Sequence, residues 1–474
     1  MGTLIKNGDI ITATERMRAD VYVEDGIVQA IASSLDAKPG DRVIDASGCY
    51  VFPGGIDVHT HLDMPFMGTV STDDFETGTR AAAIGGTTGV IDFVMPERGQ
   101  PLLDALEVWH AKARGKAVSD YAFHMAVTHY SDAVGRELPQ VVEAGITSFK
   151  TFMAYKGSIG IDDAGLFQVM RKTRDLGALV TVHAENAEVV DGLVREMVAE
   201  GKLHPRYHAL SRPALAEAEA THRAIALAEI NARSLYIVHL TCDEALAHVK
   251  HAHCRGQHVM AETCPQYLLL DDSRYEGPDF EGAKYVMSPP LRKPKDNEAL
   301  WQAIAAGYIQ TVATDHCPFD FQGAKQMGRD NFAKIPNGAP GIEDRLALLY
   351  TYGVVPGRIS LNRFVEVFAT NPAKIFGLFP RKGTVAVGAD ADLVVFDPTI
   401  KGRISASTHH QRVDYNPFEG FETIGAPTHV LINGQLAVEG GKYVGEPGTG
   451  RYLPRKPSTT VRNTGHLEGV ATGF

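Results

Sequence analysis

The middle of the chain repeats one pattern: a short apolar segment, a polar loop, and a longer segment rich in Ala, Leu and Glu. The apolar segments are residues 55–62, 87–94, 121–128, 147–152, 179–183, 235–240, 258–262 and 311–315. Intervening segments such as residues 104–112 and 214–228 have the composition of helices. Eight strands that alternate with helices are typical of a closed parallel barrel. The sequence therefore predicts an α/β fold, a (β/α)8 TIM-like barrel over residues 53–377.

Both ends of the chain differ from this middle part, because short apolar runs there alternate with turn residues. Runs of this kind include residues 21–23, 27–31, 384–385, 393–396 and 430–432. Such spacing predicts strands joined by short turns. We expect residues 1–52 and 378–455 to form one β-sandwich domain from both chain ends. The polar residues 456–474 predict a C-terminal tail, either a frayed terminus, which we slightly favour, or an arm that packs on another subunit.

The composition excludes several classes of partner. The 474 residues carry 46 Lys and Arg against 57 Asp and Glu, a net charge of −11, without a basic block. This balance argues against nucleic acid as a partner. No segment approaches the roughly 18 apolar residues of a membrane helix, and residues 1–12 lack the apolar core of a signal peptide. The five scattered cysteines predict no disulfide framework, so we expect a cytoplasmic protein without a membrane or nucleic-acid partner.

Histidines and an aspartate stand at the ends of four predicted strands. His59 and His61 lie two residues apart on the first strand, so both side chains point to the same side. His183, His239 and Asp315 each end a later apolar strand. An isolated pair of histidines is more often structural, but the carboxyl ends of barrel strands meet at one face. The whole set therefore predicts a metal site on that face.

Lys150 ends the fourth predicted strand at the equivalent place. An ammonium group beside divalent cations would be strongly repelled in a pocket of low dielectric constant. Lys150 is therefore either a solvated surface residue or an amine that carbon dioxide has converted into a carbamate. A carbamate has two oxygens and could bridge two metal ions.

Five segments, residues 55–61, 148–156, 182–186, 287–292 and 314–319, resemble one known family. They are similar to the cyclic-amidohydrolase branch of the amidohydrolase superfamily, and within it to dihydropyrimidinases and D-hydantoinases. The motifs occur in order, and the resemblance runs from about residue 4 to 445. It implies two Zn²⁺ ions per subunit and a homotetramer. By position, one ion would be held by His59, His61, carboxylated Lys150 and Asp315, and the other by Lys150, His183 and His239.

The resemblance also implies an activity. The enzyme would be a hydrolase of pyrimidine catabolism that opens the cyclic amide (ureide) bond of dihydropyrimidines and 5-substituted hydantoins to N-carbamoyl amino acids. A metal-bridging hydroxide would attack the ring carbonyl. Asp315 would take the proton and deliver it to the leaving nitrogen. Tyr155 would donate a hydrogen bond to the developing oxyanion.

Substrate contacts follow from the same resemblance. Tyr155 and the backbone groups of Ser288 and Asn337 would bind the planar imide edge, whose donors and acceptors suit main-chain groups. Walls for the ring substituent are expected from residues that follow the first and fourth strands, namely Leu62, Met64, Phe66 and Phe152. Ordinary core packing is an equal interpretation for Phe66.

Two alternative functions remain, one a related enzyme and the other a non-catalytic protein. An allantoinase or dihydroorotase-like cyclic amidohydrolase would share the ligand set. Dihydroorotase-like chains place an arginine soon after the histidine pair, where this chain has Leu62 and Asp63, and allantoinases usually lack a match to Tyr155. A non-catalytic, dihydropyrimidinase-like assembly protein would have lost metal ligands. All six ligand positions are filled here, which favours an enzyme.

Overall fold

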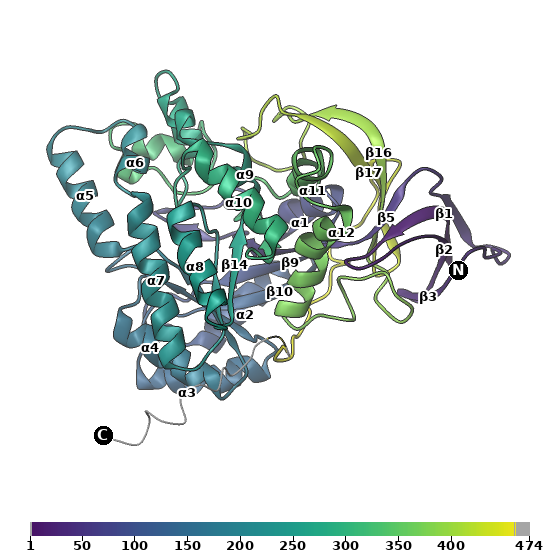
Figure 1. The fold of residues 1–474 in the computed structure, drawn as a ribbon, viewed down its shortest axis with the longest axis horizontal. Helices are drawn as coiled ribbons and strands as arrows, with labels where there is room; N and C mark the ends of the chain where they lie inside the picture. The colour runs from purple at the N-terminus through teal and green to yellow at the C-terminus, as the bar shows by residue number, and fades with distance from the viewer. Residues whose placement is uncertain (1, 459, 461–474) are drawn as a thin grey trace.

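Eight parallel strands form the centre of the computed structural model, which describes residues 2–458 and 460 (Figure 1). Each strand pairs with the next along the chain, so the sheet order follows the sequence. The strands are β6 (Gly55–Thr60), β9 (Thr87–Val94), β10 (Asp120–Ala126), β11 (Ser148–Phe152), β12 (Leu179–His183), β13 (Leu235–Ile237), β14 (Val259–Thr263) and β15 (Thr311–Val312). Every residue of β9 and β10 is buried, as expected for strands covered on both faces. The predicted barrel is confirmed.

Helices connect the strands and cover the outside of the barrel (Figure 1). The helix α3 is typical, because its buried residues Val134, Leu138 and Val141 recur every three or four positions. The helices predicted at 104–112 and 214–228 correspond to α2 and α7. The α-helices are α1 (Phe75–Ile84), α2 (Leu102–Ala113), α3 (Asp132–Glu143), α4 (Asp163–Arg174), α5 (Ala187–Ala199), α6 (Arg206–Leu210), α7 (Ala214–Ile230), α8 (Asp243–Cys254), α9 (Pro265–Leu269), α10 (Pro294–Ala306), α11 (Arg345–Leu349), α12 (Leu361–Val365) and α13 (Asn371–Ile375).

Shorter elements lie in the loops. The strands β7 (Pro65–Phe66) and β8 (Thr69–Val70) form a small hairpin in the loop after β6. The remaining short helical turns are η1 (Asp272–Glu276), η2 (Glu281–Tyr285), η3 (Ala324–Gly328), η4 (Phe332–Lys334), η5 (Tyr350–Val354) and η6 (Glu366–Thr370). Across residues 2–458 and 460, no helix is long and apolar enough to cross a membrane.

The first and last barrel strands meet through a few specific contacts. An isolated parallel bridge joins Thr60 to His316, beyond the end of β15. At the other end of the strands, the fully buried Arg345 donates to the carbonyl of Ile56 on β6 at 2.9 Å and to that of Val312 on β15 at 3.0 Å. Arg345 therefore ties the two strands that close the barrel.

Four predicted strands extend past the carboxyl ends of the observed ones, and three of these carry candidate ligands. β6 ends at Thr60, β13 at Ile237 and β15 at Val312, so His61, His239 and Asp315 lie one to three residues beyond a strand. His239 and Asp315 have positive φ angles of 36° and 52°. A left-handed backbone leaves the extended ladder, which explains why these two strands end early.

The two chain ends form a second sheet of nine strands (Figure 1). Its order is β19-β18-β17-β16-β5-β1-β2-β3, with β4 paired to β1, and the pair β5–β16 joins the two ends of the chain. The strands are β1 (Thr3–Ile11), β2 (Arg16–Glu24), β3 (Ile27–Ala32), β4 (Arg42–Asp45), β5 (Tyr50–Pro53), β16 (Leu393–Arg403), β17 (Glu422–Ile432), β18 (Gln435–Glu439) and β19 (Lys442–Tyr443).

Side chains on these strands alternate between two cores. Ile10 and Val51 pack in a cluster enclosed by the sheet itself, whereas their neighbours Ile11 and Phe52 pack in the main core with the barrel helices. The predicted sandwich-like module from both chain ends is therefore observed, and its strands form one continuous hydrogen-bonded path. The predicted strand at 384–385 is not a strand, because a turn bounded by Gly383 and Gly388, both with positive φ, occupies this segment. The predicted tail, residues 456–474, lies largely outside the described residues.

Replacing Arg345 by methionine tests the closure of the barrel. We expect Arg345→Met to lower the free energy of unfolding by about 3 kcal/mol, because buried carbonyls on β6 and β15 lose their donor. Urea denaturation followed by circular dichroism measures this change. The control Arg403→Met removes an exposed pair with Glu422 and should cost less than about 1 kcal/mol. Equal losses in the two variants would contradict the role of Arg345.

Candidate active site

One cavity at the carboxyl ends of the barrel strands contains the predicted metal-binding residues. It brings together side chains from loops that are far apart in the sequence. The cavity is lined by His59, His61, Met64, Phe66, Met95, Lys150, Phe152, Tyr155, Ile159, His183, His239, Ser288, Asp315, Cys317, Asn337 and Gly338. All six predicted metal-binding residues are among them.

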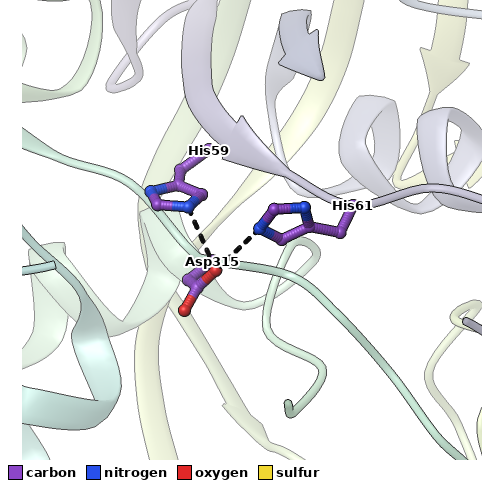
Figure 2. A group of neighbouring side chains, drawn as sticks. All are labelled: His59, His61 and Asp315. Atoms are coloured by element: carbon purple, nitrogen blue, oxygen red, sulfur yellow. Dashed lines mark ion pairs between the residues drawn. The ribbon is translucent and has the colours of Figure 1, made fainter. Parts of the chain in front are cut away.

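His59, His61 and Asp315 form one cluster in this cavity (Figure 2). The Nε2 atoms of His59 and His61 each lie 3.2 Å from Oδ1 of Asp315. The loop that carries Asp315 is held on β6, because Thr314 donates its hydroxyl to Asp57 at 2.6 Å. One potential ligand atom from each of the three residues lies within 4.8 Å of the others, a spacing at which they could share a cation.

His183 and His239 form a second cluster. His183 Nδ1 lies 2.9 Å from His239 Nε2, so these two ring nitrogens face each other. The other nitrogen of His183 is 2.8 Å from the carboxylate of Glu185, which also accepts a bond from Arg212 at 2.6 Å. Burial raises the pKa of Glu185, but Arg212 and His183 outweigh it and hold the pKa at about 2. Glu185 is therefore an anion that orients the ring of His183.

Lys150 is fully buried in the same cavity. Its Nζ lies 4.9 Å from the ring centroid of Phe93 and 5.0 Å from that of Phe152. Within the described residues, Nζ has no hydrogen-bond partner. Burial lowers the pKa of Lys150 to about 8, so near neutral pH a larger fraction of this amine is neutral than for an exposed lysine. A neutral amine is the form that reacts with carbon dioxide.

The donor set fits metal ions. Besides Lys150 Nζ, the buried atoms His61 Nδ1 and His239 Nδ1 lack hydrogen-bond partners in the described part of the chain, and His59 Nε2 contacts Asp315 without forming a hydrogen bond. Burial holds the pKa values of His59 and His239 well below their usual range, so both imidazoles are neutral, the form that binds metals. Imidazole nitrogens with carboxylate oxygens are ligands that zinc accepts.

A second layer of contacts orients His59. Its Nδ1 lies 2.5 Å from the carboxylate of Glu262, which also accepts a bond from Tyr236 at 2.8 Å. A carboxylate behind a histidine fixes the ring orientation and leaves the other nitrogen for a metal. Glu262 is the last residue of the predicted strand at 258–262, and no function was predicted for it.

Three residues of the cavity have strained backbones. The φ angles of Tyr155, His239 and Asp315 are 61°, 36° and 52°. A left-handed conformation is unfavourable for residues other than glycine and is concentrated at functional sites. Asp and His are enriched among the non-glycine residues with positive φ, but most Asp and His residues do not adopt this conformation, so the residue types alone do not mark these positions.

Tyr155, Ser288 and Asn337 lie together on one side of the cavity. Asn337 Nδ2 donates to Ser288 Oγ at 2.9 Å and lies 3.4 Å from the hydroxyl of Tyr155. Burial raises the pKa of Tyr155, so its phenol stays protonated and can donate a hydrogen bond. The three residues predicted to contact a polar substrate edge are therefore neighbours.

The prediction of the apolar residues that line the cavity is confirmed in part. Met64, Phe66 and Phe152 line the cavity, but Leu62 does not. Leu62 is fully buried in the main core, where it packs so closely on α1 that a Cβ at Gly78 would lie 2.3 Å from it. The structure adds Met95 and Ile159. Both residues lie in loops that follow barrel strands. The sequence could not predict their position, because an apolar loop residue can line a cavity or pack in the core.

The chain belongs to the amidohydrolase family, whose sequence model matches residues 50–437. Among characterised relatives, it is 54% identical to the D-hydantoinase of Geobacillus stearothermophilus over 456 residues, which cover 96% of this chain and 97% of the relative. It is 50% identical to the D-hydantoinase of Ralstonia pickettii, with 96% and 99% of the two chains covered.

Solved structures agree with this assignment. The dihydropyrimidinase from Brevibacillus agri is 52% identical, with a TM-score of 0.96, and 97% of this chain and 99% of that chain are covered. The L-hydantoinase from Arthrobacter aurescens is 30% identical, with a TM-score of 0.87, and the coverage is 96% and 99%. The fold and the chain length are therefore shared with hydantoinases and dihydropyrimidinases.

Proposed function

We propose that this chain hydrolyses the cyclic amide bond of dihydropyrimidines and 5-substituted hydantoins and releases N-carbamoyl amino acids. The observation that carries the proposal is the buried amine of Lys150, which has no hydrogen-bond partner in the described residues and shares a cavity with four histidines and Asp315. The names of the full-length relatives support the substrate class.

The metal ions form part of the proposal. Two Zn²⁺ ions would be held by His59, His61 and Asp315 on one side and by His183 and His239 on the other, with Lys150 carboxylated as the bridge. Such a pair supplies a hydroxide near neutral pH and polarises the ring carbonyl.

Side chains of the protein would transfer the proton, stabilise the oxyanion and bind the substrate. Asp315 accepts the proton of the nucleophile and delivers it to the leaving ring nitrogen. The phenol of Tyr155 donates a hydrogen bond to the carbonyl oxygen as negative charge develops there. The backbone of Ser288 and Asn337 pairs with the imide edge, while Met64, Phe66 and Phe152 contact the ring substituent.

The wider assignments are also proposals. We propose a homotetramer that acts in the cytoplasm, in pyrimidine catabolism, on small cyclic ureides. All five cysteines are free thiols, which suits a reducing compartment. We further propose residues 53–377 as the catalytic domain and residues 1–52 with 378–455 as the supporting domain.

A substrate panel tests the proposed function. Purified protein with its metal content measured is incubated with dihydrouracil, 5-substituted hydantoins, allantoin and dihydroorotate, and ring opening is followed by loss of ultraviolet absorbance. We expect turnover of dihydrouracil and hydantoins. Opening of allantoin alone would contradict the proposal, and a metal-free chain inert to all four rings would indicate an assembly protein.

Replacing Lys150 tests the carbamate bridge. We expect Lys150→Ala to lose bound metal and activity together, because the two ions lose their shared ligand, and short carboxylic acids should restore part of both. Metal analysis and hydantoin turnover measure the two effects. Lys156→Ala, an exposed lysine in the same loop region, is the control and should keep both. A Lys150→Ala variant that retains two zinc ions would contradict the bridge.

Replacing Tyr155 tests oxyanion stabilisation. We expect Tyr155→Phe to lower kcat by about 100- to 1000-fold, because one donor to the developing charge is removed. Metal content should not change, since the hydroxyl is not among the proposed ligands. Steady-state kinetics separates kcat from KM, and a variant with a normal kcat would show that Tyr155 is only a wall of the cavity.

A further inference from the structure

Lys325 is a second fully buried lysine, and the proposed chemistry does not use it. It lies on η3, in the loop after β15. Its Nζ donates to three backbone carbonyls: Val286 at 2.8 Å, Pro336 at 2.7 Å and Gly338 at 2.7 Å. An ammonium group has three N–H donors, so its hydrogen-bonding capacity matches these acceptors.

The three carbonyls belong to two segments of the cavity. Val286 lies two residues before Ser288, in the loop after β14, and Pro336 and Gly338 flank Asn337 in the loop after β15. The amide of Gly338 also donates to the carbonyl of Val286 at 3.0 Å. Lys325 therefore lies where the two segments that carry the predicted substrate contacts meet.

Lys325 has no ion pair with a carboxylate in the described part of the chain. Burial lowers its pKa to about 7. Cys317 acts in the opposite direction and raises the pKa, and the three carbonyl dipoles also favour the protonated form. Burying a charged lysine without a counter-ion raises the free energy of the folded protein. The position of Lys325 between two loops indicates that this cost is offset by holding the loops together.

Neighbouring contacts complete the arrangement around Ser288. His208 Nε2 donates to the carbonyl of Met287 at 2.7 Å, and the hydroxyl of Tyr267 donates to that of Pro289 at 2.7 Å. By contrast, no described residue hydrogen-bonds to the backbone N–H or C=O of Ser288 or Asn337. The chain thus holds the carbonyls beside these two residues and leaves their own backbone groups available.

We propose that Lys325 is a positioning residue for the substrate, one that sets the separation between the backbone of Ser288 and the backbone of Asn337. A rigid cyclic imide can bond to both segments only at one separation, so the lysine determines how well the ring edge is matched. This inference rests on the proposed function, because it takes a cyclic imide as the ligand.

Kinetics of Lys325→Met is the first test. The variant keeps most of the side-chain volume and removes all three donors. We expect KM for dihydrouracil to rise about 10- to 100-fold, as for a displaced binding group, with kcat changed less than about threefold and metal content unchanged. A lower kcat at constant KM would overturn the proposal.

The matched control is Lys382→Met. Lys382 is also buried, and its Nζ lies 2.8 Å from Asp120 and 3.2 Å from Asp390, in a network away from the cavity. We expect this variant to lose thermal stability and to keep the wild-type KM. If both variants raise KM equally, the effect is general loosening and the proposal is wrong.

Hydrogen exchange tests the same role without turnover. In the wild-type protein, the amide of Gly338 should exchange slowly, like amides of β9, and Lys325→Met should accelerate it at least about tenfold. Gly338 exchange as fast as that of the exposed loop at 156–158 in the wild type would overturn the proposal, even if no variant folds. Lys325→Gln, which keeps two N–H donors, is the milder second variant, and an intermediate KM is expected.

The two readouts separate the inference from the function it rests on. If the wild-type protein opens none of the rings in the panel, the proposed function fails, and exchange at Gly338 still reports whether Lys325 holds the two loops. If the rings are opened but neither KM nor exchange responds to Lys325→Met, the proposed function stands and the positioning role is wrong.

Discussion

The burial of Lys150 is the constraint on which the cavity depends. An amine enclosed by Phe93 and Phe152, without a hydrogen-bond partner in the described residues, is unfavourable unless its chemistry or its surroundings change. The barrel brings His59, His61, His183, His239 and Asp315 around it from separate strand ends. Carboxylates such as Glu185 and Glu262 then orient the histidines from behind. The buried amine, the histidines and Asp315 around it, and the carboxylates behind the histidines therefore form one connected site.

The architecture supports this arrangement at two levels. The proposed metal ligands lie on or just beyond barrel strands, whose backbones are held in a hydrogen-bonded sheet. The proposed polar substrate contacts Tyr155, Ser288 and Asn337 lie in loops, and side chains such as Lys325 and Tyr267 hydrogen-bond to carbonyls of two of these loops. With this arrangement, changes in the loops can alter substrate recognition while the metal ligands at the strand ends stay in place.

The sequence predicted the barrel and the convergence of its ligands, because short continuous apolar segments and polar residues at their ends are local signals. It extended the strands before His239 and Asp315 too far, because His and Asp adopt a left-handed backbone only occasionally and their residue types alone do not mark it. It placed Leu62 in the cavity and omitted Met95, since the direction of an apolar side chain after a strand depends on tertiary packing. The role of Lys325 was also hidden, because its partners are backbone carbonyls from distant loops.

The pairing of β5 with β16 has a consequence for biosynthesis. β5 leaves the ribosome early, whereas its neighbour β16 follows only after the whole barrel has been translated. Until then, one edge of β5 has unsatisfied backbone groups that could pair with another nascent chain. Because β5 has only four residues, few of its backbone groups are exposed in this way. Once the barrel is complete, β16 pairs with this edge of β5. The N-terminal strands therefore complete their pairing only after the barrel has been translated, although they are the first to be made.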